Sequence, residues 1–594
     1  MRTRWFVKEM GDQAADSGRH GDVRGLPAPW MTPTTHAFPF RLLTAWLALW
    51  LLSACNQSTP PPPTPTATTA ASTATVVLPS STPGPAASST PSATKPSTTP
   101  TLTPVTQTAT TSPTPTSART NAPVVSPTLA ATSTSTPAPQ PTLATTPTAA
   151  PTVSLYERQI TLNTYPFAAF QREVTDPVFN WSWRMLDRAA YEAAQPQPTP
   201  QALREVVLEN EFLRLGVLPD LGGRLIECYY KPTRHQVFYR NPVLKPSPWG
   251  PPGRDGLEAG WLAAGGVEWG IPVEEHGYAW GTPWGYDTPQ PSPDEATITV
   301  FQEPQGRLQI SVDITLRAGE AAFTVRTRLT NATGQEATFK YWINAMLAPG
   351  GRNRPGPELR LILPINEVTI HSTGDSTLPG SGQAMSWPNF QGRDLSRLGN
   401  WRQYLGFFAR PAAAAGFAGV YDLAADEGLA RVFPADVMRG VKFFGLGWSD
   451  PLPAALYTDD GSSYVEMHGG LAPTFDERVN LRAGETLYWE ETWFPVAGIG
   501  TFVYADQDGA VNLRATAQGL QIAIFPVRSF RGKLTVSVDG AAIANLPVTL
   551  NPARPFDQVI AVPANVPARA SVAIQLLDAE GAAILQFEQE MTLR

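Results

Sequence analysis

Residues 308–316 read LQISVDITL and residues 322–329 read AFTVRTRL, and apolar and polar side chains alternate in both stretches. Alternation with a period of two is typical of a β-strand with one buried and one exposed face. A short stretch containing Gly319 joins the two. The segment therefore predicts two neighbouring antiparallel strands.

The same alternation recurs along most of the chain after residue 200. It is found in residues 204–217, 296–302, 337–343, 406–421, 429–433 and 485–494. Strands at this spacing, joined by turns of Gly, Pro, Asn and Asp, predict an all-β antiparallel sandwich over residues 154–499. One helix is expected at residues 183–194 (WRMLDRAAYEAA), which end at a Gln-Pro run.

A second, smaller set of strands begins near residue 500. Residues 500–594 contain short alternating stretches such as 519–525 (GLQIAIF) and 533–539 (KLTVSVD). About seven short strands in a segment of this length predict an immunoglobulin-like or fibronectin-like β-sandwich. This segment lacks Trp and His and has no clustered acids, so we interpret it as a structural or spacer module.

The N-terminal region contains an apolar run, residues 42–52 (LLTAWLALWLL). It is too short to span a bilayer, which needs about 20 residues, and it suits a signal peptide. The residues that follow, Leu52-Ser53-Ala54-Cys55, resemble a bacterial lipobox, which implies cleavage before Cys55 and lipid attachment to its sulfur. We expect residues 1–55 to be a lipoprotein signal peptide. The alternative is an ordinary signal with a chance cysteine, and a start at Met31 gives a more conventional length.

Residues 56–153 contain 21 prolines and 30 threonines, with no aromatic residue and no acid. Such a segment cannot bury enough apolar surface to offset its ordering entropy, so we predict a disordered linker. The linker is expected to hold the folded part away from the membrane. The chain is therefore expected to be extracytoplasmic and lipid-anchored to the bacterial membrane or cell surface.

Charge and motifs exclude several classes of function. Residues 154–594 carry 36 basic and 47 acidic side chains, which argues against a nucleic-acid-binding protein. The sequence contains no phosphate-binding loop, dinucleotide-binding fingerprint or nucleophile elbow, and no metal-ligand spacing stands out. We therefore expect no cofactor and no metal ion, and the oligomeric state stays open.

Tryptophans and polar side chains gather in several segments. A pyranose has apolar C–H faces and a ring of hydroxyls, so its site needs an aromatic platform and fixed hydrogen-bonding groups. The platform candidates are Trp269, Trp280, Trp284, Trp342 and Trp387. The rim candidates are Glu268, His276, Asp287, Asn344 and Asn389. Each of these tryptophans can equally belong to the hydrophobic core, and His276 can equally be a structural residue.

Five sequence blocks resemble a family of bacterial domains of unknown function, DUF5107. They are LPDLGGR (218–224), FYRNPV (238–243), GGVEWGIPVEEHG (265–277), YWINAMLAPGG (341–351) and YWEETWFPV (488–496). This family looks related to galactose mutarotases and aldose epimerases. The resemblance covers roughly residues 200–500. It implies a supersandwich of two large antiparallel sheets with a sugar bound in a cleft on one sheet face.

The resemblance also implies catalytic roles. Glu466 stands roughly where mutarotases place their catalytic base. Asn344 is followed by alanine where mutarotases have the histidine that acts as the acid, so either His276 or Glu268 has to take that role. The second choice would allow glycosidase or lyase chemistry between Glu268 and Glu466.

The expected catalytic residues are therefore Glu268, His276 and Glu466. The expected saccharide contacts are Arg224, Trp269, Trp280, Trp284, Asp287, Trp342, Asn344, Trp387 and His468. His468 shares a face with Glu466 if the strand is regular. By contrast, His235 and His371 are expected to be solvated in polar turns.

Three functions compete on this evidence. The first is a surface-tethered carbohydrate-binding protein, or a carbohydrate-active enzyme with epimerase-like or glycosidase-like acid–base chemistry. The second is a non-catalytic adhesion module, and the third is a structural protein of the cell envelope. Convergence of Glu268, His276 and Glu466 at one place favours an enzyme.

Overall fold

The computed structural model describes residues 152–303, 307–411 and 416–593. The predicted signal peptide with Cys55, and the predicted linker up to residue 151, lie outside the described residues. Within the described part of the chain, no helix is long and apolar enough to cross a bilayer.

The largest sheet has 13 strands. Its order is β18 (Ala384–Ser386), β17 (Glu367–Thr373), β21 (Leu405–Arg410), β24 (Gly440–Gly445), β25 (Val465–Gly470), β15 (Trp342–Leu347), β9 (Gly266–Gly270), β6 (Arg224–Tyr230), β5 (Leu213–Leu218), β4 (Thr199–Glu209), β1 (Ser154–Thr164) and β8 (Val243–Leu244), and β7 (His235–Gln236) pairs with β6. Apart from the parallel β1–β8 pair, these strands run antiparallel. We call it the first sheet.

A second sheet has eight strands. Its order is β10 (Gly285–Asp287), β11 (Glu295–Gln302), β12 (Leu308–Arg317), β13 (Phe323–Asn331), β27 (Thr486–Ala497), β23 (Glu427–Val432), β22 (Phe417–Asp422) and β16 (Leu359–Ile362). Strands β12 and β13 are the stretches whose alternation predicted the fold. They pair antiparallel, with Ile310 opposite Leu329.

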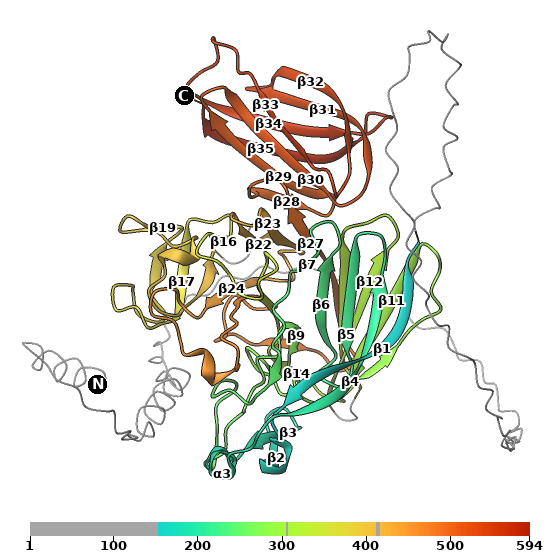
Figure 1. The fold of residues 1–594 in the computed structure, drawn as a ribbon, viewed down its shortest axis with the longest axis vertical. Coiled ribbons are helices and arrows are strands. Elements are labelled where there is room, and N and C mark those ends of the chain that lie inside the picture. The colour runs from blue at the N-terminus through green and yellow to red at the C-terminus, as the bar shows by residue number, and fades with distance from the viewer. Residues whose placement is uncertain (1–151, 304–306, 412–415, 594) are drawn as a thin grey trace, which may run out of the picture. The chain divides into compact units, whose positions relative to one another are not determined.

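The predicted all-β sandwich is thus confirmed, and Figure 1 shows its strands. The residues around 500–593 form two four-stranded sheets. The first has the order β28 (Tyr504–Asp506), β29 (Gly509–Thr516), β30 (Gly519–Pro526) and β33 (Phe556–Ile560). The second has the order β32 (Ala541–Leu550), β31 (Phe530–Val538), β34 (Arg569–Leu577) and β35 (Ala583–Thr592).

Short elements complete the fold. The two-stranded sheets are β2 (Gln171–Asp176) with β3 (Trp181–Leu186), β14 (Ala337–Phe339) with β26 (Val479–Leu481), and β19 (Asn389–Phe390) with β20 (Arg393–Asp394). The 3-10 turns are η1 (Ala168–Phe170), η2 (Leu398–Asn400) and η3 (Ala454–Leu456).

The helix expected at residues 183–194 is shorter than predicted. The structure has α3 only over Arg188–Ala194, and the residues before it form strand β3. The reason is local. Trp183 and Met185 alternate with exposed neighbours, as in a strand, and the Asp187 side chain caps the helix by accepting a hydrogen bond from the Ala190 amide.

The two large sheets bury one hydrophobic core. From the first sheet, Val267, Ala345, Met467 and Phe443 lie opposite one another on successive strands and join this core. From the second sheet, β12 contributes Leu308, Ile310, Val312, Ile314 and Leu316. The residues between the inward-facing ones on the first sheet therefore project from its opposite face.

A buried charged side chain of the second sheet packs against strand β25. The Arg431 side chain on β23 is fully buried and pairs with Glu491 on β27, with Nε 2.7 Å from Oε2. A Cβ added to Gly469 would lie 2.0 Å from an Arg431 guanidinium nitrogen, so only glycine leaves room for it. The Arg431 side chain therefore packs directly against β25. On the same strand, positions 466 and 468 face outward.

Candidate functional site

A row of polar side chains crosses the outward face of the first sheet. Glu268 on β9 lies opposite Asn344 on β15, and Asn344 lies opposite His468 on β25. His468 lies opposite Lys442 on β24. Because directly paired residues point to the same face, these four side chains form one continuous row. All four are 1% exposed or less.

Arg224 extends the row at the β6 end. Its guanidinium lies 2.6 Å from Glu268 Oε2, and both side chains are essentially inaccessible to solvent. The guanidinium also donates to the carbonyl of Gly265 at 2.9 Å. The block LPDLGGR therefore supplies the permanent positive charge that faces Glu268.

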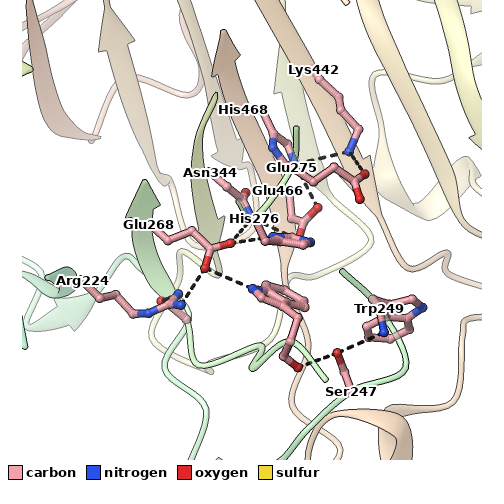
Figure 2. Close-up of polar contacts among 12 residues, drawn as sticks. Arg224, Ser247, Trp249, Glu268, Glu275, His276, Asn344, Lys442, Glu466 and His468 are labelled. Atoms are coloured by element: carbon pink, nitrogen blue, oxygen red, sulfur yellow. Dashed lines mark hydrogen bonds and ion pairs between the residues drawn. The ribbon is translucent and has the colours of Figure 1, made fainter. Parts of the chain in front are cut away.

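The loop after β9 folds His276 back over the row. His276 Nδ1 lies 2.6 Å from Glu268 Oε1, as Figure 2 shows. Gly277 makes the reversal with a φ of 64°, and a Cβ there would lie 2.2 Å from the Ile271 amide nitrogen. The glycine in the sequence His-Gly is therefore required by the turn.

Trp261 holds His276 from the other side. The two rings stack with centroids 3.7 Å apart and an interplanar angle of 16°. The Trp261 indole also donates to Glu268 Oε2 at 3.1 Å. Trp261 was not among the residues predicted from the sequence, because its surroundings (GWLAAGG) carry no charged or amide side chain to mark it.

Glu268 is held as a carboxylate. Burial opposes its ionisation, but the charges of Arg224 and His276 outweigh burial and lower its pKa to about 2. In the opposite direction, burial alone would lower the pKa of His276, yet Glu268 raises it above the ordinary value. Glu268 and His276 are therefore a charge pair that fixes the orientation of the imidazole.

Glu466 lies on the far side of His276, and Figure 2 shows Glu268, His276 and Glu466 pointing toward one another. Burial raises the pKa of Glu466, although Lys442 and His276 lower it. Its carboxyl accepts from Asn344 Nδ2 at 3.4 Å and lies 3.0 Å from His468 Nε2. The cluster thus holds one carboxyl with a lowered pKa and one with a raised pKa. We call Glu268, His276, Asn344, Lys442, Glu466 and His468 the Glu466 site.

Further charged groups border the site beyond Glu466. Lys442 Nζ lies 3.1 Å from Glu275 Oε1, and His371 Nε2 lies 4.0 Å from the same oxygen. The side chains of Glu275 and His371 are 19% and 22% exposed, whereas that of Lys442 is 1% exposed. Side-chain exposure therefore increases from Lys442 toward Glu275 and His371.

The expectation that His371 is solvated is wrong. It lies on β17 and packs edge-on against Phe408 and Phe475. Burial and the nearby Lys442 lower its pKa to about 4. His235 is also held, because its Nδ1 lies 2.6 Å from Glu427. Lys442 was not predicted from the sequence, although a lone lysine in the apolar strand GVKFFG was the available signal.

Several buried polar atoms of this region have no hydrogen-bond partner among the described residues. They are Arg224 Nε, Trp342 Nε1, Asn344 Oδ1 and His468 Nδ1. Trp342, Asn344 and His468 belong to the paired strands β15 and β25 and lie on one face. Unpaired polar atoms at such depth are costly unless a ligand or water satisfies them. They offer a donor, an acceptor and a ring nitrogen that can be either.

The predicted tryptophan platform is wrong for most of its members. Trp269, Trp284 and Trp387 belong to the core between the sheets, where their indoles donate to carbonyls of Gly223, Ala279 and Leu363. Trp269 follows Glu268 on β9 and so points to the opposite face, and Trp284 and Trp387 are buried in the same core. None of the three rings therefore has a face free for a sugar.

The other predicted contacts fall in different places. Trp280 is buried in a separate apolar cluster. Trp342 is on the correct face but is buried against Phe408 and Phe475. Asp287 and Asn389 are exposed on β10 and β19, outside the Glu466 site. The structure does bring together Arg224, Glu268, His276, Asn344, Glu466 and His468.

Within residues 152–593, apart from the two internal gaps, no group of three His, Cys, Asp or Glu side chains is placed to hold a metal ion.

Removal of the Glu268 charge should release the proton from His276. In the wild type the charge pair stabilises the fold between the pKa of Glu268, about 2, and the raised pKa of His276, and is lost outside that window. In Glu268→Gln the strongest attraction that favours the imidazolium is lost while burial remains, so the His276 pKa should fall, although Glu275 and Glu466 still raise it. Titration of 13C-labelled histidine by NMR measures this change.

Glu427→Gln is the matched control, because it removes a carboxylate held at the same 2.6 Å from a different histidine, His235. It should leave the His276 titration where it is. In the same spectra the His371 resonance should titrate near pH 4. A His276 pKa that is equal in wild type and Glu268→Gln would contradict the electrostatic account of the site.

The chain was compared with known families and structures. Residues 184–496 match the family described as a domain of unknown function, DUF5107, and residues 504–587 match the second domain of YphG-like proteins. The similar solved structures include a TPR-domain containing protein from Parabacteroides distasonis ATCC 8503, which is 21% identical. That match covers 61% of this chain and 57% of the other, with a TM-score of 0.48.

Two further similar structures are named for galactose mutarotase. A galactose mutarotase-like protein from Clostridium acetobutylicum is 9% identical over 50% of this chain and 96% of its own, with a TM-score of 0.37. A galactose mutarotase related enzyme from Lactobacillus acidophilus is 9% identical over 49% and 97%, with a TM-score of 0.33. Because the first family match spans more than half of the 594 residues, the chain belongs to the DUF5107 family.

Proposed function

We propose that this chain is a carbohydrate-active protein that binds a saccharide at the Glu466 site and moves protons on it by acid–base chemistry. The observation that carries the proposal is the pair of buried carboxyl groups, Glu268 and Glu466, whose pKa values are displaced in opposite directions. Opposed environments of this kind let one site keep a fixed charge beside a group that gains and loses a proton.

The hydrogen-bonding groups of the site suit a polyhydroxylated ligand. Each sugar hydroxyl is both a donor and an acceptor. The unpaired atoms Trp342 Nε1, Asn344 Oδ1 and His468 Nδ1 offer both kinds of partner on one sheet face. A saccharide hydroxyl that enters there satisfies polar atoms that are otherwise buried without partners.

The roles follow from the protonation states. Glu466, whose pKa burial raises above the ordinary value, is the group assigned to take and return a proton. His276, held as an imidazolium by Glu268, is the proton donor. Glu268 keeps its charge throughout and positions His276 through the 2.6 Å contact to Nδ1.

The simplest reaction for this set is opening of an aldose ring. Glu466 takes the proton from the anomeric hydroxyl O1, a carbonyl forms between C1 and O1, and the C1–O5 bond breaks as His276 protonates O5. Rotation about the C1–C2 bond and the reverse steps close the ring on the other face, which restores both groups. A positioned acid or base of this type accelerates the reaction by about 10²–10⁴-fold.

Hydrolysis or elimination with Glu268 as the acid is the less favoured reading. A general acid needs a proton at neutral pH, and Arg224 and His276 keep the pKa of Glu268 at about 2. A purely adhesive role does not require a raised pKa at Glu466. Binding of a saccharide without turnover would favour this role.

Replacement of Glu466 by glutamine should abolish turnover and leave binding largely intact. The amide keeps the size and hydrogen-bonding capacity of the side chain but cannot accept the O1 proton. Turnover is the conversion of freshly dissolved α-glucose, or of α-galactose, to the β anomer of the same sugar. Polarimetry in the presence of the full-length protein measures its rate. Calorimetry with the same sugars measures binding.

Glu490→Gln is the matched control, because Glu490 is an exposed glutamate of β27 that pairs with Arg326 on the outside of the second sheet. It should retain both activities. Equal loss of binding and turnover in Glu466→Gln would argue against a catalytic role. Binding without turnover in the wild type would favour the adhesive alternative.

We also propose that the protein is anchored by lipid at Cys55, outside the cytoplasm. The support is the sequence Leu52-Ser53-Ala54-Cys55 after an apolar run, followed by the Pro/Thr-rich segment.

In bacterial cells fed an alkyne fatty acid, the full-length protein should carry the label and sediment with membranes. Cys55→Ser should lose both properties, whereas Cys228→Ala, which alters a buried cysteine of β6, should keep them. Unchanged labelling of Cys55→Ser would contradict the anchor.

A further inference from the structure

A small apolar pocket lies beside the Glu466 site. It has a volume of about 150 Å³. Its walls include Leu446, Trp448, Leu452, Ala454, Tyr457 and Tyr464, and Arg354 lies at its edge. Trp448 is half-buried and Arg354 is exposed, so the pocket opens to solvent near these two residues. We call it the Tyr464 pocket.

The register of two strands places this pocket next to Glu466. Glu466 on β25 lies opposite Phe444 on β24. Leu446 and Tyr464 each lie one residue beyond the end of their strand, and they pack in one apolar cluster with Phe444 and Met346, the two residues that lie opposite Glu466. Two residues of a strand span about 7 Å, which is close to the spacing of adjacent sugar rings in a chain. The pKa of Tyr464 is raised by burial and by the nearby Glu466, in keeping with this proximity.

The lining of the pocket suits a ring with apolar faces. The Tyr457 hydroxyl already donates to the Ser462 carbonyl at 2.8 Å, so the pocket presents the ring of Tyr457 rather than its polar end. The rings of Tyr457 and Tyr464 meet edge to face with centroids 5.4 Å apart. Indole and phenol rings pack against the C–H faces of a pyranose, and a guanidinium donates to hydroxyls at its rim.

The size of the pocket limits what it can hold. Sites for whole drug-sized ligands span about 300–1,000 Å³, so a cavity of about 150 Å³ admits a single ring. A ligand that reaches Glu466 and also fills this pocket therefore has two units, one at each place.

We propose that the Tyr464 pocket holds the second sugar ring of a disaccharide or longer saccharide whose first ring lies at the Glu466 site. This rests on the proposed function and narrows its substrate class. The ring that reacts is the reducing-end aldose, and the ring in the pocket is the unit attached to it. A free monosaccharide leaves the pocket unused and binds more weakly.

Two substitutions with opposite effects on volume test the pocket. Trp448→Ala removes the half-buried indole from the wall of the pocket, and Ala454→Trp fills the cavity with an indole. Calorimetry with the full-length protein compares galactose with β-1,4-galactobiose, and glucose with maltose and cellobiose. In the wild type at least one disaccharide should bind more tightly than its monosaccharide. Both variants should weaken disaccharide binding about five- to tenfold and leave monosaccharide binding unchanged.

Tyr488→Ala is the matched control, because Tyr488 is an aromatic residue that is 68% exposed on β27 of the second sheet. It should change neither affinity. Circular dichroism checks folding, and if Ala454→Trp does not fold, the comparison rests on Trp448→Ala and on Trp448→Tyr, which should restore disaccharide binding.

The outcomes separate the two proposals. Wild-type protein that binds monosaccharides and disaccharides equally, or variants that weaken both to the same extent, would overturn the pocket assignment and leave the Glu466 site standing. Wild-type protein that binds none of the five sugars would overturn both.

Discussion

The buried pair of Glu268 with Arg224 and His276 is the interaction on which the rest of the site depends. A carboxylate removed from water is very costly unless opposite charges and hydrogen bonds surround it. Here a guanidinium and an imidazole each lie 2.6 Å from a different oxygen, and the Trp261 indole adds a third contact. The strand β9 supplies Glu268, the strand β6 supplies Arg224 and a glycine turn supplies His276, so three separate segments have to fold before the charge is satisfied.

This arrangement divides the work between two glutamates. Glu268 is committed to its charge and holds His276 as an imidazolium. Glu466, two strands away on β25, has the weaker set of partners, and burial raises its pKa. A fixed anion beside a proton-exchanging carboxyl is a common design for acid–base sites. The Arg431 guanidinium packs against β25 where Gly469 has no side chain, three residues after Glu466.

The sequence predicted the architecture and part of the site, for identifiable reasons. The alternation in residues 308–316 and 322–329 is a local property, and it appears as strands β12 and β13. Glu268, His276 and Glu466 were found because they lie in recognisable blocks, and the structure brings them together.

The tryptophan platform was mistaken because composition does not tell which face of a strand is buried: Trp269 follows Glu268 by one residue and so points into the core. Lys442 and Trp261 were missed because their importance arises from cross-strand pairing and loop packing, which no local pattern displays.

The central claim is that a saccharide binds between His276 and Glu466 on the outward face of the first sheet. A crystal structure of the protein soaked with lactose tests it most directly. The account predicts density for a sugar ring in contact with the Glu466 carboxyl and the His276 imidazole, with its hydroxyls paired to Asn344 and His468. Density for the sugar only at another place, for example on the exposed face around Tyr488, would contradict the account.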